Sequence, residues 1–156
     1  MSFRSIPHDI VAYLRQHGTP TGLTKSESLY YIGYPRSPSV EFPIVAITPG
    51  GGSGERMAMG DPGNRFSETY QIDIYTDSDA VADIGGGTRY AQNELITYLS
   101  SELSKTIRDD RCTIMDTVGL IDIWISSTPR IMPYIEDMDL YRGIMRLTIQ
   151  YNDPRS

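Results

Sequence analysis

The sequence predicts an α+β domain: an antiparallel or mixed β-sheet of about four or five strands, with two helices packed on one face. Two observations carry this prediction. From Arg65 to Tyr75 apolar and polar residues alternate, which is typical of a strand with one buried and one solvated face. From Thr88 to Ile107 apolar residues recur at helical spacing, which predicts a long amphipathic helix. The apolar face of that helix needs a sheet to cover, and the preceding strand offers one.

The N-terminal part predicts a helix and then two strands. Ser5 suits an N-cap and Pro7 suits a first turn, while Gly18 followed by Pro20 marks a stop, so we expect a helix over residues 6–17. Residues 29–33 are expected to form a short strand. Residues 41–48, rich in β-branched side chains, are expected to form a longer one.

A glycine-rich segment over residues 49–64 is expected to be a long hairpin loop between two paired strands. Structureless loops longer than about 12–15 residues are usually functional or disordered. This one carries an apolar and cationic group, which we take as a candidate subunit or partner interface together with Arg65 at the start of the next strand. The three loop residues of this candidate interface are Arg56, Met57 and Met59.

After the 65–75 strand we expect a turn over residues 76–87, with a helical turn of its own at 80–84. A polar connection is expected at 108–116. Residues 118–127 are apolar on nearly both faces, so this strand is expected to be central in the sheet or covered at an interface, and Trp124 is added to the candidate interface. Pro129 and Pro133 bracket an expected irregular link, Ile135–Asp139 is acidic, and a half-buried strand is expected at 141–151. Residues 1–156 are read as one domain.

Composition narrows the class of protein. The net charge of −6 argues against binding nucleic acid through a broad basic surface. The N-terminal residues lack the apolar core of a signal peptide, no apolar run approaches the ~20 residues of a membrane span, and the single cysteine, Cys112, forms no intrachain disulfide. The 12 Arg against 2 Lys, and 13 Asp against 7 Glu, suit a halophilic host; ordinary compositional drift is the alternative.

Motifs for catalysis and cofactor binding fail at specific residues. The glycines at 50–54 are not followed by the Gly-Lys pair of a phosphate-binding loop, and those at 85–87 lack the third glycine of a dinucleotide fingerprint, which would fall at Tyr90. A calcium loop beginning at Asp77 would need glycine at Ala82. His8 and His17 are nine residues apart on one helix and face opposite ways. We therefore expect no catalytic residue, no cofactor and no metal site, and a protein that is not an enzyme.

The order of elements resembles the tail-terminator proteins of long-tailed phages and archaeal tailed viruses, which complete the tail and join it to the head. The resemblance covers most of the chain: an N-terminal helix, the Phe42–Ile47 strand, an extended hairpin loop, the Tyr70–Tyr75 strand, an acidic turn, the helix around Tyr90–Leu103, and closing strands that end at Arg146–Tyr151. It rests on layout alone, so no residue role is carried over.

The resemblance implies a structural virion protein that forms a ring, usually a hexamer, at the end of the tail tube. Its implied partners are further copies of itself, the tail tube protein and the head–tail connector protein. DNA would pass through the lumen without specific recognition, no membrane would be involved, and assembly would take place in the host cytoplasm. The alternatives are another neck or connector component, or a small-ligand-binding domain or enzyme with a site between loops 49–64 and 76–87.

Overall fold

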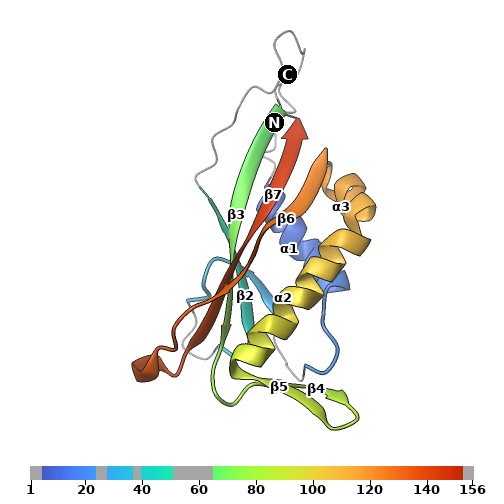
Figure 1. Ribbon diagram of the computed structural model, residues 1–156. Coiled ribbons are helices and arrows are strands. Elements are labelled where there is room, and N and C mark those ends of the chain that lie inside the picture. The colour runs from blue at the N-terminus through green and yellow to red at the C-terminus, as the bar shows by residue number, and fades with distance from the viewer. Residues whose placement is uncertain (1–4, 24–27, 37–39, 51–64, 153–156) are drawn as a thin grey trace.

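The computed structural model describes residues 5–23, 28–36, 40–50 and 65–152 (Figure 1). The described chain is α+β, with a five-stranded mixed sheet in the order β1-β2-β3-β7-β6 and a separate two-stranded sheet, β4-β5. In the large sheet β1 and β2 run parallel, and every other neighbouring pair is antiparallel. The elements are α1 (Ile6–His17), β1 (Tyr30–Ile32), β2 (Ile44–Pro49), β3 (Arg65–Thr76), β4 (Val81–Gly85), β5 (Thr88–Ala91), α2 (Gln92–Asp109), α3 (Arg111–Val118), β6 (Asp122–Ile131), the short 3-10 helix η1 (Glu136–Met138) and β7 (Tyr141–Asn152).

The long pair β3 and β7 forms the middle of the sheet. All twelve residues of β3 have a partner on β7, from Arg65 opposite Asn152 to Thr76 opposite Tyr141. Tyr70, Ile72 and Ile74 of β3 point into one core, and their buried side chains explain the alternation in the sequence. The 65–75 strand and the 141–151 strand are thus confirmed.

One hydrophobic core joins a single face of this sheet to the helices. It includes Ile10 and Leu14 from α1, Leu99 from α2 and Ile114 from α3, together with Leu147 from β7. In Figure 1 the helices lie on the same side of the strands. Helix α2 approaches β7 closely at Gly143, where an added Cβ would come within 2.4 Å of Ile96 Cγ2 on α2. The absence of a side chain at this position lets α2 pack directly against the strand.

Three sequence-based expectations about this part of the chain were wrong. Residues 76–87 were expected to be a turn with a helical segment, but β4 and β5 form a hairpin around three glycines with positive φ, Gly85, Gly86 and Gly87. The long helix accordingly begins at Gln92 and not at Thr88. Residues 108–116, expected to be a polar connection, contain most of α3, because Ile114 and Val118 are buried one turn apart and Gly119 ends the helix at φ 81°.

The strand expected at 118–127 also differs in bounds and in place. β6 runs from Asp122 to Ile131 and lies at the edge of the sheet, not at its centre. Ile123 is buried under the helices, whereas Trp124 on the opposite parity keeps 36% of its surface exposed. β6 thus carries a large apolar side chain on each face, and the helices bury only the face of Ile123. Whether an interface covers the other face stays a prediction.

Candidate functional site: an apolar hairpin tip and a groove at the sheet edge

The β6–β7 hairpin extends beyond the body of the domain. Figure 1 shows its orange-red end, which includes η1, projecting away from the helices. Four large apolar side chains of this end are exposed, a concentration that a hairpin turn in water does not require. They are Ile131 at 39%, Tyr134 at 42%, Ile135 at 40% and Met138 at 66%. We call residues 131–138 the hairpin tip; it also exposes Glu136 and Asp137.

The conformation of the tip is held by hydrogen bonds around one carboxylate. Asp139 adopts a left-handed conformation, with φ 48°, at the end of η1. It accepts hydrogen bonds from the Tyr134 hydroxyl at 2.7 Å, from the Ser78 amide at 3.2 Å and from the Ser78 hydroxyl. These hydrogen bonds lower the pKa of the Asp139 carboxyl, with the largest effect from the Ser78 hydroxyl and the next from the Tyr134 hydroxyl. Because Ser78 belongs to the link between β3 and β4, the carboxylate ties the tip to the body.

Backbone and ring contacts add to this order. Ile135 and Leu140 exchange two backbone hydrogen bonds, of 2.9 and 3.1 Å, and Met132 donates to the carbonyl of Arg142 at 2.8 Å. The rings of Tyr134 and Tyr141 stack with their centroids 4.4 Å apart. The apolar side chains are therefore presented on a shaped surface and not on a structureless turn.

A groove of about 350 Å³ lies at the other end of β6, beside the open edge of the sheet. Ile107 of α2 contributes to its lining, together with Ile123, Trp124 and Ile125 of β6. The remaining lining residues are Ser104, Arg108, Arg111 and Asp122. The groove thus combines apolar side chains with two guanidinium groups and one carboxylate.

The cations of the groove are held near its rim. Arg111 makes an ion pair with Asp122, with Nη2 2.5 Å from Oδ1, and its Nε donates to the same oxygen at 2.9 Å. Arg108 pairs with Asp109 at 3.1 Å, but 75% of the Arg108 side chain remains exposed. Exposed pairs of this kind contribute about 0–1 kcal/mol, so Arg108 can exchange its partner at little cost.

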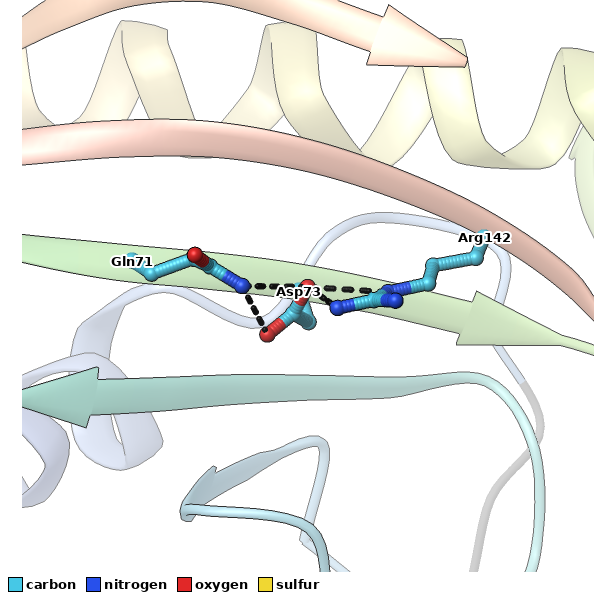
Figure 2. Close-up of polar contacts among 3 residues, drawn as sticks. All are labelled: Gln71, Asp73 and Arg142. Carbon is cyan, nitrogen blue, oxygen red and sulfur yellow. Dashed lines mark hydrogen bonds and ion pairs between the residues drawn. The ribbon is translucent and has the colours of Figure 1, made fainter. Parts of the chain in front are cut away.

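A polar cluster on the other face of the sheet is a structural feature. Figure 2 shows Asp73 of β3 between Gln71 and Arg142. Arg142 donates to Asp73 Oδ1 from Nε at 3.0 Å and from Nη2 at 2.7 Å, while the Gln71 amide donates at 3.0 and 3.2 Å. With both oxygens engaged, the carboxylate links β3 to β7.

The residues predicted for the interface have different outcomes. Arg56, Met57 and Met59 lie outside the described residues. Arg65 is exposed at the start of β3, and Trp124 is exposed on β6 and lines the groove. In the sheet register the two residues are four residue pairs and two strands apart, about 16 Å. The structure does not bring them into one site.

The hairpin tip was not predicted. The sequence predicted an irregular link between Pro129 and Pro133, followed by an acidic stretch over Ile135–Asp139. The signal was present in the sequence, because Ile131, Met132, Tyr134, Ile135 and Met138 are unusually apolar for a connection between two strands. Pro129 falls where the pairing of β6 with β7 shifts register, between Ser127 and Arg130, so it ends neither strand.

No group of three or more His, Cys, Asp or Glu residues in the described part of the chain is arranged to hold a metal ion. None of its helices is both long and apolar enough to span a membrane.

Comparison with known proteins gives no family assignment. No protein-family model matches the chain, and no curated protein matches it.

Proposed function

We propose that this chain is a structural virion protein that assembles into a ring, a hexamer in keeping with the tail-terminator layout, and closes the end of a viral tail tube. The observation that carries the proposal is the ordered hairpin tip, which holds four exposed apolar side chains on an arm away from the core. Apolar surface of this kind marks a site of protein–protein contact. A shaped arm on a small domain suits a subunit that reaches to its neighbour.

The open edge of β6 supports the same proposal. A ten-residue edge strand offers unpaired backbone groups and is a hazard for uncontrolled association unless another element covers it. Burial of that edge against a neighbouring subunit would satisfy these groups. The proposed partners beyond the ring are the tail tube protein on one side and the head–tail connector protein on the other, with DNA passing through the lumen without specific recognition. The role is structural and not enzymatic.

The alternative of a ligand site between loops 49–64 and 76–87 gains no support from the described residues. Pro49, at the entrance of the first loop, pairs with Tyr70, whereas the second segment begins at Thr76. Six residues of an extended strand separate these points, which is about 20 Å. The described ends of the two segments are therefore not adjacent.

Light scattering coupled to size-exclusion chromatography, with electron microscopy of the same fractions, tests the proposal. We expect a defined oligomer that appears as rings. Rings added to purified tail tubes of the same virus should bind at tube ends and not along the sides. A species that stays monomeric at every concentration tested, with or without tubes, would contradict the proposed function.

A further inference from the structure

We propose that the ring is closed by a heterologous contact, in which the hairpin tip of one subunit docks into the β6 groove of the next. This inference rests on the proposed ring assembly and specifies its interface. The occupant of the groove is thus a second copy of the same chain. The groove is defined by Ile107, Arg108, Arg111, Trp124 and Ile125, and the tip by residues 131–138.

The two surfaces match in chemistry. The tip exposes Ile135 and Met138 next to the carboxylates of Glu136 and Asp137. The groove has an apolar lining and two guanidinium groups, of which Arg111 is paired with Asp122 and Arg108 is paired with Asp109 and stays largely exposed. Methionine and isoleucine side chains fill an irregular apolar groove well, and an arginine can bind a carboxylate through two donors.

Arg108 is the side chain best placed for this exchange of partner. It is largely exposed, and among the described residues its ion pair is with its chain neighbour Asp109. In the contact, Arg108 would exchange its solvent-exposed pair with Asp109 for a pair with a carboxylate of the tip that is shielded from water. Such a pair favours the correct alignment of tip and groove, whereas a positive charge on the tip at this point would oppose docking. The contact therefore predicts a charge-dependent assembly in which Arg108 faces an acidic residue of the tip.

The positions of the two surfaces allow a contact that repeats from subunit to subunit. Trp124 and Ile131 lie seven residues apart on the same strand, a distance of about 23 Å. The tip extends still further from the groove (Figure 1). A contact between such unlike surfaces can repeat until the rotation closes a ring, whereas a reciprocal exchange across a two-fold axis stops at a dimer. A wild-type oligomer larger than a dimer is therefore expected, and a wild-type dimer would overturn the ring-closing contact.

A mixing experiment tests this geometry. Met138→Glu removes the apolar contact of the tip, and Arg108→Glu reverses the charge of the groove. We expect each variant alone to be monomeric. An equimolar mixture should give a 1:1 dimer and nothing larger, because the intact tip of the Arg108→Glu chain can enter the intact groove of the Met138→Glu chain and neither chain can then extend.

Charge reversal gives a second arm of the test. Asp137→Arg should weaken assembly at least tenfold, and Asp137→Arg combined with Arg108→Glu in one chain should restore rings. Ile84→Ser and Glu94→Arg serve as matched controls, since both residues are exposed away from the tip and the groove. Circular dichroism of each variant checks that the monomer is folded.

The outcomes separate this inference from the proposed function. Rings of the wild-type chain that persist in both single variants would overturn the tip-in-groove contact and leave ring assembly standing. Loss of rings in both single variants without any dimer in the mixture would also overturn it, because that result fits a contact between like surfaces. A wild-type chain that never assembles would overturn the proposed function, and this inference with it.

Discussion

The ion pair between Asp73 and Arg142 allows a stability prediction worked from the structure. Only 7% of the Asp73 side chain and 30% of the Arg142 side chain are exposed. Arg142→Met keeps most of the aliphatic stem but removes the two donors to Asp73 Oδ1, while the Gln71 amide still donates to the carboxylate. Figure 2 shows Gln71 on the same strand as Asp73 and Arg142 on the neighbouring strand. The variant therefore leaves a buried charge with weaker compensation.

The expected loss is about 3 kcal/mol at pH 7. Breaking a buried pair by removing one partner costs about 3–5 kcal/mol, and the lower end applies because Gln71 remains and the guanidinium is partly solvated. Part of the loss comes from the contact of the Arg142 guanidinium with the Tyr75 ring, 5.5 Å from its centroid. Such a contact contributes about 0.5–1 kcal/mol at partly exposed sites.

Urea unfolding at pH 7, followed by Trp124 fluorescence and circular dichroism, measures the free energy of unfolding of each variant. Asp73→Asn together with Arg142→Met should recover most of the stability lost by Arg142→Met, because the double variant buries no charge. Simple additivity of the two substitutions in the double variant would refute the electrostatic explanation and would indicate loss of side-chain packing instead.

Three further predictions concern other parts of the fold. Burial raises the pKa of Tyr30 and of Tyr70 above the ordinary value of 10.0, so the stability that each neutral phenol contributes is complete below pH 10 and is lost above it, by about 1.4 kcal/mol per pH unit for each phenol. Tyr30→Phe should lower the alkaline slope measured by urea unfolding by the share of one phenol. Asp139→Ala should speed hydrogen exchange of the Ile135 and Leu140 amides at neutral pH and leave the melting temperature nearly unchanged. Because its hydrogen bonds lower the pKa of Asp139, these two amides of the wild-type tip should lose their protection from exchange only in acid, below about pH 4. Gly143→Ala should cost about 1–3 kcal/mol because its Cβ would lie 2.4 Å from Ile96 Cγ2, and Ile96→Val should relieve part of that cost in the double variant, whereas strict additivity in thermal unfolding would show that the two residues do not meet.

The sequence was sufficient to predict the parts of the fold whose apolar residues face one core. The alternation along Arg65–Tyr75 and along Tyr141–Tyr151 predicted β3 and β7, because both strands bury one face under the helices. Helix α1 was predicted with its observed bounds for a similar reason. In these elements the local pattern and the tertiary environment agree.

Elements that depend on a few long-range contacts were missed. The β4–β5 hairpin buries Ala82 and forms a bridge with Leu23, and such a short strand carries little periodic signal. Helix α3 has eight residues, and only Ile114 and Val118 are buried. Its polar sequence therefore resembles a loop. Its position is fixed by packing against α1, α2 and β6, which no local pattern contains.

The hairpin tip was missed for a different reason, and that reason bears on assembly. Apolar residues are normally interpreted as core, so a run of them between two strands was assigned to neither strand nor surface. Ile131, Ile135 and Met138 are not part of the core, since their side chains are exposed. Trp124 has the same character at the opposite end of β6. A sequence under selection for a soluble monomer would place polar residues at these positions. Apolar residues at both ends of this edge strand are explained if each end is buried against a neighbouring copy. One end would be the tip that enters the neighbour, and the other would be part of the groove that receives the neighbour's tip.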